Sequence, residues 1–185
     1  MTQNVKEIPV IWLAASACTG CSVSLLNAAS PRVKNLLVDQ VIPGAHVNLT
    51  FHQTIMAGSG EVAITALEKS AKEHKGKYLL AVDGAIPTGD MASCCAMGEE
   101  GGRAVTMEER FTDLAKGALA VMAVGTCASF GGVAATAPNP SNAQPLDRVM
   151  KAKKIDKPLI NVPGCPPHPD WIMGPISHII LHGLP

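Results

Sequence analysis

Short apolar runs recur along the chain every few tens of residues, and stretches with helical periodicity separate them. The runs expected to form strands are Pro9–Ala15, His46–His52, Lys77–Ile86, Ala118–Val124 and Pro158–Val162. The stretches expected to form helices are Ser22–Ala29, Glu61–Lys75, Thr106–Lys116, Leu146–Lys154 and Pro169–His182. This alternation is typical of successive β-α units around a parallel sheet. It predicts an α/β fold, with a flavodoxin-like doubly wound sheet of five parallel strands.

Three local signals refine this prediction. Ala118–Val124 is the most apolar of the runs, which favours a central strand that is buried on both faces. Thr106 and Glu109 have the spacing of a capping box, so a helix is expected to begin at this point. The segment Ile86–Gly102 contains Gly and Pro and has no clear periodicity, which predicts a long loop that is functional or disordered.

The composition excludes some classes of function. Apolar residues make up 47% of the 185 residues, enough for one hydrophobic core, so we expect a single domain over residues 1–185. Lys plus Arg and Asp plus Glu both number 15, and without a basic surplus nucleic acid is not an expected partner. The chain has no run of about 18 apolar residues, so no membrane span is expected. No signal sequence or transit peptide is recognisable at its start, which predicts a cytoplasmic location.

Four cysteines share one kind of setting, a Gly- or Pro-rich loop directly after an apolar run. Cys18 and Cys21 lie in CTGC, Cys127 in GTCASFGG and Cys165 in PGCPPHP. These loops follow the first, fourth and fifth expected strands, and the carboxyl ends of parallel strands meet at one edge of a sheet. Four thiolates that converge there fit one 4Fe-4S cluster. The sequence therefore predicts an electron carrier, in which nearby glycines let the backbone approach the sulfurs.

Two other uses of these cysteines stay open at this point. CTGC alone fits a thioredoxin-like redox pair, although that reading leaves Cys127 and Cys165 without a role. A structural zinc site also takes four thiolates, although such sites more often use two close pairs. The remaining cysteines, Cys94 and Cys95, are expected to be thiols outside the ligand set.

The histidines are weaker candidates for metal ligands. His168, at the expected start of a helix, is predicted to form hydrogen bonds instead of binding a metal. His178 and His182 are four residues apart on one helical face, but the sequence offers no third ligand beside them. We therefore expect both to be surface or interface residues.

The cysteine motifs resemble those of one known family, the small subunits of nickel-iron hydrogenases. WLxxxxCTGCSVSLLNA, the (E/D)GAIP strand end, AVGTCASFGG and NVPGCPPHPDWI occur here in the order of that family and span nearly the whole chain. CSVSLLNA looks most like the nickel-iron-selenium branch. By this resemblance, Cys18, Cys21, Cys127 and Cys165 ligate the proximal 4Fe-4S cluster, the one nearest the nickel-iron centre of a separate large subunit.

The resemblance implies the electron-transfer subunit of a cytoplasmic nickel-iron hydrogenase, with no catalytic residue of its own. Many members continue into a C-terminal domain that holds medial and distal clusters, whereas this chain stops at Pro185 without such ligands. A short form with only the proximal cluster is therefore expected. Its expected partners are the hydrogenase large subunit and iron-sulfur flavoprotein subunits that react with NAD(P) or ferredoxin. Asp83 stands where relatives often have Glu, so the family role in proton movement is not carried over to this position.

A second family shares part of this pattern. The related quinone-reductase subunit of respiratory complex I has the same fold and the last two cysteine loops, but its first cysteine pair is adjacent and directly follows the first strand. In this chain that place holds CTGC, and the adjacent pair comes after the third expected strand. The hydrogenase interpretation is therefore preferred. The alternatives are an iron-sulfur subunit of a complex I-like quinone reductase and a non-catalytic, zinc-stabilised scaffold.

Overall fold

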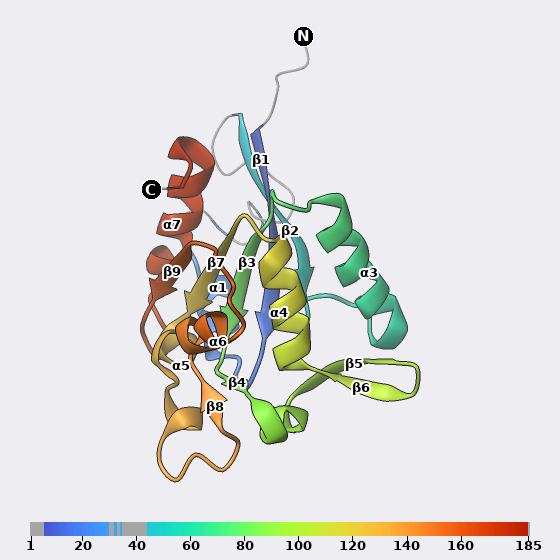
Figure 1. Ribbon diagram of the computed structural model, residues 1–185. Helices are drawn as coiled ribbons and strands as arrows, with labels where there is room; N and C mark the ends of the chain where they lie inside the picture. Colours follow the sequence, from blue (N-terminus) through green and yellow to red (C-terminus); the bar gives the residue numbers. More distant parts are fainter. Residues whose placement is uncertain (1–5, 30–31, 33, 35–43, 185) are drawn as a thin grey trace.

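The computed structural model describes residues 6–29, 32, 34 and 44–184 (Figure 1). Its centre is a five-stranded parallel sheet with the strand order β2-β1-β3-β7-β9. The strands are β1 (Lys6–Ala14), β2 (Ala45–His52), β3 (Leu79–Asp83), β7 (Ala120–Val124) and β9 (Leu159–Val162). This is the flavodoxin-like order, so the predicted fold class is confirmed.

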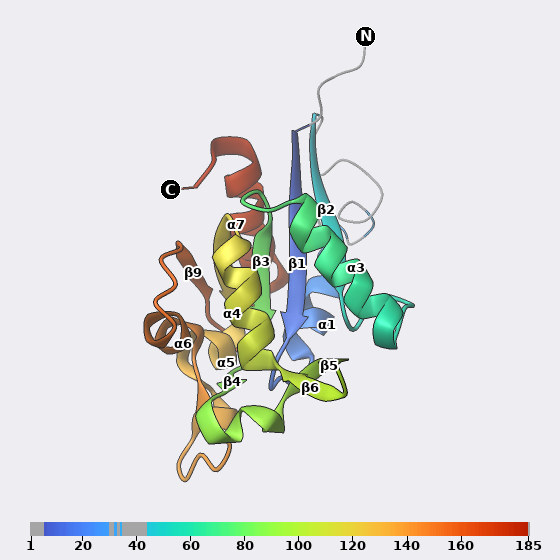
Figure 2. The ribbon, with the colours of Figure 1, turned by 45° about the vertical axis from the view of Figure 1, so that its right-hand side comes forward.

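Helices cover both faces of the sheet, as Figures 1 and 2 show. One face packs against α1 (Gly20–Leu26) and α7 (Pro169–His182). The other face packs against α3 (Gly60–Glu73), α4 (Met107–Gly117), α5 (Gly125–Phe130) and α6 (Leu146–Ala152). Each face thus has its own hydrophobic core. None of the helices formed by the described residues is long and apolar enough to cross a membrane.

The inner strands β1, β3 and β7 are mainly apolar because both faces of the sheet are covered. In β1, Val10 and Trp12 enter the core beneath α1 and α7, whereas Ile11 and Leu13 enter the opposite core. Every residue of β3 and β7 is buried. The run expected to be central forms β7, but β3 occupies the middle of the sheet. Two strands buried on both faces look alike in sequence, so their apolar character does not give their order.

The segment expected to be a long loop is largely ordered. It contains β4 (Ile86–Pro87), a short 3₁₀ helix (Gly89–Cys94) and a hairpin formed by β5 (Ala96–Glu100) and β6 (Arg103–Thr106). β4 pairs with β8 (Ala143–Gln144), which follows a second 3₁₀ turn (Val133–Ala135). The hairpin reverses at Gly101 and Gly102, whose φ angles of 59° and 80° suit a two-residue turn. Its strands carry several exposed polar residues, so a search for apolar runs in the sequence did not predict them.

Arg110 of α4 fastens this hairpin to the rest of the protein. Its guanidinium lies 2.8 Å from Glu68 Oε1 on α3 and 3.0 Å from Glu100 Oε1 on β5. Its Nε also donates a hydrogen bond to the Met97 carbonyl oxygen at 3.2 Å. The side chain of Arg110 is only 10% exposed, so the two carboxylates compensate a charge that is largely removed from water.

The start of α4 agrees with the sequence prediction. The Thr106 hydroxyl accepts a hydrogen bond from the Glu109 backbone N–H at 3.2 Å, and the Glu109 carboxylate accepts one from the Thr106 N–H at 2.9 Å. The capping box is therefore confirmed. Arg103 lies 3.0 Å from Glu109, and this interaction, together with the hydrogen bonds from Thr106, lowers the pKa of Glu109 to about 2.

Candidate functional site

Three loops carry the four predicted cysteines to the carboxyl edge of the sheet. Cys18 and Cys21 follow β1, with Cys21 in the first turn of α1. Cys127 lies in α5, which begins directly after β7, and Cys165 lies between β9 and α7. Figure 1 shows these strands running in the same direction toward the end of the molecule where α5 and β8 lie. The convergence therefore follows from the parallel topology.

Hydrogen bonds between the loops hold them against one another. The Thr126 N–H donates to the Gly164 carbonyl oxygen at 2.8 Å, and the Gly164 N–H donates to Thr126 Oγ1 at 3.3 Å. These bonds join the loop of Cys127 to that of Cys165. The Ser24 hydroxyl donates to the Pro167 carbonyl oxygen at 2.6 Å, which joins α1 to the same loop. All three cysteine loops are thus tied together by the chain itself.

Electrostatic interactions link the four thiols into one group. Cys127 interacts with Cys165 and with Cys18, and Cys21 interacts with Cys127 and with Cys18. Cys21 is buried, Cys127 is half-buried, and Cys18 and Cys165 are exposed. The group of four thiols therefore extends from the core beneath α1, where Cys21 lies, to the protein surface. The structure brings together all four residues that the sequence singled out.

Glycines keep side chains away from three of the four sulfurs. A Cβ atom on Gly20 would lie 3.2 Å from Cys18 Sγ, and one on Gly125 would lie 2.5 Å from Cys21 Sγ. A Cβ atom on Gly132 would likewise lie 2.5 Å from Cys127 Sγ. Gly125 and Gly132 also have φ angles of 86° and 55°, which residues other than glycine rarely adopt. The backbone thus forms a close cradle around the sulfurs, and this cradle and the four thiols fit a cluster with sulfur ligands.

Burial keeps two of the four free thiols, those of Cys21 and Cys127, in their protonated form. Burial raises the pKa of Cys21, and the nearby Asp83 raises it further. Burial likewise raises the pKa of Cys127. A raised pKa is compatible with metal binding, because a coordinated thiol loses its proton to the metal.

Asp83 is a residue of this site that the ligand prediction did not include. It ends β3, is 3% exposed, and accepts a hydrogen bond from the Ser22 hydroxyl at 3.4 Å. It also interacts with the Cys21 side chain. Burial raises the pKa of Asp83 although hydrogen bonds from Cys21 and Ser22 oppose the shift. The signal in the sequence was an acidic residue at the end of a wholly apolar strand, a position that topology places beside the cysteine loops.

The structure gives the other candidate ligands different contacts. Cys94 is exposed, and the half-buried Cys95 packs beside the core under α4, with its thiol hydrogen-bonded to Ser16. His168 caps α7, because its Nδ1 accepts a hydrogen bond from the Asp170 N–H at 3.3 Å. Among the described residues, no three His, Cys, Asp or Glu side chains are arranged to bind a single metal ion. A four-iron cube does not require such an arrangement, because each thiolate binds a different iron atom.

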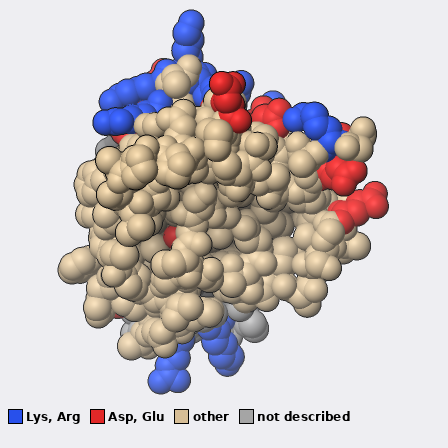
Figure 3. All heavy atoms as spheres, turned by 90° about the horizontal axis from the view of Figure 1, so that it is seen from below, with Lys and Arg blue, Asp and Glu red and all other residues tan. Residues whose placement is uncertain are grey.

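The surface around the cysteine loops is poor in charge. Figure 3 views the molecule from the carboxyl edge of the sheet and shows a broad face with few charges: a small acidic patch is visible near its centre, and most charged side chains are gathered at its margins. Large apolar side chains close to the cysteines in sequence are exposed, with 65% of Phe130, 84% of Val133 and 61% of Trp171 accessible. Exposed apolar side chains with few charges around them are a feature that many protein interfaces share.

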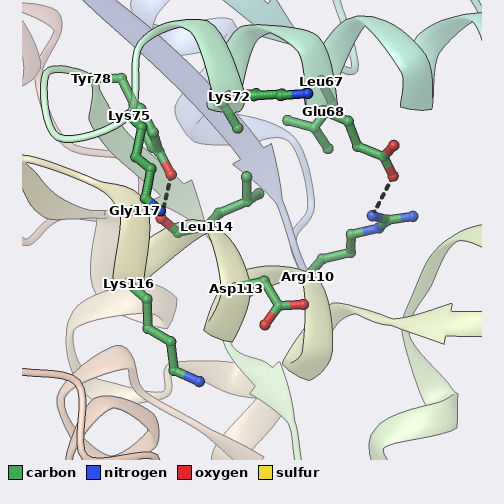
Figure 4. A pocket seen from close by; sticks show the side chains of 11 residues that line it. Leu67, Glu68, Lys72, Lys75, Tyr78, Arg110, Asp113, Leu114, Lys116 and Gly117 are labelled. Carbon is green, nitrogen blue, oxygen red and sulfur yellow. Dashed lines mark hydrogen bonds and ion pairs between the residues drawn. The ribbon is translucent and has the colours of Figure 1, made fainter.

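A separate groove lies between α3 and α4 (Figure 4). It has a volume of about 450 Å³, an apolar floor that includes Leu67 and Leu114, and lysines at its margin. The Tyr78 hydroxyl donates a hydrogen bond to the Leu114 carbonyl oxygen, and burial raises the pKa of Tyr78 to about 12. Tyr78 and Gly117 precede β3 and β7, so this end of the groove faces the amino edge of the sheet. None of the predicted ligands lines it.

Comparisons with known proteins agree on one group of relatives. Residues 18–179 match the family described as NADH ubiquinone oxidoreductase, 20 Kd subunit. The chain is 42% identical over 197 residues to the periplasmic [NiFeSe] hydrogenase small subunit of Desulfomicrobium baculatum, covering 100% of this chain and 61% of the relative. It is also 42% identical over 177 residues to the quinone-reactive Ni/Fe-hydrogenase small chain of Wolinella succinogenes, covering 96% of this chain and 46% of the relative.

The fold agrees with the same group. The crystal structure of a reduced, active form of the Ni-Fe-Se hydrogenase from Desulfomicrobium baculatum superposes with a TM-score of 0.87 and 43% sequence identity. The superposition covers 95% of this chain and 64% of that chain. This chain therefore spans between about half and two thirds of the length of these relatives.

The relatives contradict the cytoplasmic location expected from the sequence. The Desulfomicrobium baculatum relative is named periplasmic, and the Wolinella succinogenes relative is named quinone-reactive. The expectation relied on the start of the chain, where no signal sequence or transit peptide was recognised. That observation is not decisive, because the fold of a domain does not encode its compartment.

The family match includes all four converging cysteines, and the sequence and structural similarities extend over nearly the whole chain. The chain therefore belongs to the family of the 20 kDa subunit of NADH ubiquinone oxidoreductase, and within this family it is related to the small subunits of nickel-iron and nickel-iron-selenium hydrogenases.

Proposed function

We propose that this chain is the electron-transfer subunit of a nickel-iron hydrogenase and that Cys18, Cys21, Cys127 and Cys165 hold one 4Fe-4S cluster. The observation that carries the proposal is the convergence of the four thiols at the carboxyl edge of the sheet, inside a cradle of glycine backbone. Four cysteines are the ligand set that such a cluster takes. The relationship to hydrogenase small subunits supports the same conclusion.

The residues of the chain have distinct tasks in this proposal. The cluster, when bound, supplies one-electron oxidation and reduction. The four thiolates fix its position relative to the sheet, and the hydrogen bonds of Thr126 and Ser24 fix the loops that carry them. Gly125 and Gly132 leave room for the backbone beside the sulfurs. Backbone N–H groups near the sulfurs are one of the means by which a protein sets the reduction potential of such a cluster.

We assign the reaction with dihydrogen to a separate large subunit that carries the nickel-iron centre. Of the six cysteines in this chain, only Cys94 and Cys95 fall outside the proposed ligand set. The large subunit is proposed to dock on the charge-poor face around the cysteine loops (Figure 3). Exposed Phe130, Val133 and Trp171 give this face the apolar contacts of a protein interface.

The acceptor of the electrons stays a prediction. Iron-sulfur flavoprotein subunits that react with NAD(P) or ferredoxin were expected from the resemblance. The name of the Wolinella succinogenes relative instead points to quinone as the acceptor for that protein. A second candidate function is an iron-sulfur subunit of a complex I-like quinone reductase, which the description of the matching family favours.

Hydrogen-dependent reduction of a redox dye separates these functions. The anaerobically purified complex that contains this chain is expected to reduce the dye under dihydrogen, and the complex without it is expected to lose most of that activity. The chain alone should be inactive, because the reacting metals belong to the partner. A complex that reduces quinone with NADH and shows no reaction with dihydrogen would support the second candidate instead.

The proposed docking face leads to a prediction for Phe130. The Phe130→Gln variant is expected to weaken the association with the large subunit by about thirtyfold, because loss of a central aromatic contact costs about 2 kcal/mol. The dissociation constant can be measured by sedimentation of the separated and remixed subunits. Leu181→Gln is the matched control. Leu181 is 46% exposed, but it lies at the C-terminal end of α7, whereas the cysteine loops adjoin the N-terminal end of that helix. Equal weakening by both substitutions would contradict the assigned face.

A further inference from the structure

His178 and His182 stand side by side on the outer surface of α7, away from the cysteine site. Both side chains are exposed, and their ring centroids are 5.0 Å apart with an interplanar angle of 47°. Residues four apart in a helix lie one above the other on the same face. α7 starts beside Cys165 and rises about 20 Å over its 14 residues, so the pair lies at its far end.

The helix backbone beneath this pair is held in place. Ile179 and Ile180 are 3% and 1% exposed, and both pack into the core under α7. The Gly183 N–H donates a hydrogen bond to the Ile179 carbonyl oxygen at 2.9 Å, which closes the last turn. The two imidazoles therefore project from a rigid support, so little backbone entropy would be lost if both bound one ligand.

The electrostatic surroundings on α7 favour a cation. The helix contains no Lys or Arg. His182 lies in its last turn, where the unpaired carbonyl groups of a helix produce a partial negative charge. A metal dication bound there would thus meet no repulsion from its own helix and some attraction from the helix end.

We propose that His178 and His182 bind one divalent transition-metal ion of the Ni²⁺, Cu²⁺ or Zn²⁺ class. Imidazole nitrogens suit these ions, and two histidines at positions i and i+4 of a helix are a known way to hold one from a single face. Ca²⁺ and Mg²⁺ prefer oxygen ligands and are not expected to bind. No third His, Cys, Asp or Glu joins the pair in the described part of the chain, so water completes the coordination.

Equilibrium dialysis of the untagged, cluster-loaded protein against Ni²⁺ under anaerobic conditions tests this site. The wild-type chain is expected to bind about one Ni²⁺ more than the His178→Asn/His182→Asn variant, with its iron content unchanged. Either single variant should bind Ni²⁺ about a hundredfold more weakly than the wild type. Once one imidazole holds the ion, the second imidazole of the wild type binds it intramolecularly, at a high effective concentration. Ni²⁺ should also raise the Tm of the wild type but not that of the double variant.

A variant with shifted spacing is the sharpest control. Ser177→His combined with His178→Ser keeps the number of histidines but places them five residues apart, about 140° around the helix. This variant should behave like a single variant. If it binds Ni²⁺ as well as the wild type, or if the double asparagine variant does, the proposed pair is not the site. The readouts do not involve hydrogenase activity, so failure here leaves the proposed function untouched.

Discussion

Replacing Cys127 with Ala is expected to abolish the iron content of the anaerobically purified protein and to remove its visible absorption. The remaining three thiols leave one iron without a protein ligand, and ligand binding energy in such domains is also folding energy. The free energy of unfolding should therefore fall as well. Iron analysis and circular dichroism of the same samples measure the two effects separately.

Cys95→Ala is the matched control for this substitution. Cys95 is half-buried like Cys127, but it packs beside the core under α4, and its thiol interacts with Ser16 and Cys94 instead of the four converging thiols. Its replacement should leave the iron content intact. Because Cys127→Ala could unfold the chain, Cys165→Ala at an exposed position provides a second test. Loss of iron from Cys95→Ala, or its retention in both other variants, would contradict the ligand assignment.

The Gly125→Ala substitution is expected to damage the site without removing any ligand. The new Cβ atom would lie 2.5 Å from Cys21 Sγ, and the φ angle of 86° at this residue strains any side chain. Together, the clash and the strain are expected to lower the free energy of unfolding by about 2–4 kcal/mol. Iron content should fall too, because Cys21 must move. Urea denaturation under anaerobic conditions and iron analysis give both quantities.

Gly174→Ala separates this effect from the general cost of replacing glycine. Gly174 lies within α7, and apart from its chain neighbours and the helix backbone no atom lies within 4 Å of the Cβ atom that the substitution would add. Alanine favours a helix interior by about 1 kcal/mol over glycine, and crowding of its Cβ atom by the ring of the following Pro175 opposes this gain, so the stability of this variant should differ little from that of the wild type. A similar loss of stability and iron in both variants would show that Gly125 has no special role beside Cys21.

Much of the fold could be predicted because its local signals agree with its topology. Pro169–His182 forms a helix over the expected residues, and the capping box at Thr106 is present. The hairpin of β5 and β6 was missed because its polar strands lack an apolar run, and Arg110 supplies the contacts that hold it. The order of β3 and β7 was not predictable from apolarity, since burial on both faces makes them look alike.

The candidate site was more predictable than these details for a physical reason. Parallel strands deliver the loops at their carboxyl ends to one edge, so cysteines distant in sequence had to converge if the fold was right. The place of Asp83 beside Cys21 follows from the same topology, but an isolated carboxylate gives no ligand pattern to recognise. The tightness of the backbone around Gly125 and Gly132 could not be read from sequence, because it depends on the packing of separate loops.

Counting the metal and sulfide in the anaerobically purified chain decides whether these thiols hold an iron-sulfur cube. We predict about four iron atoms and four acid-labile sulfides per chain, with broad visible absorption that disappears in the Cys127→Ala variant. A colourless protein that contains one zinc ion and no sulfide would contradict the proposal, because the four cysteines would then serve a structural site instead of electron transfer.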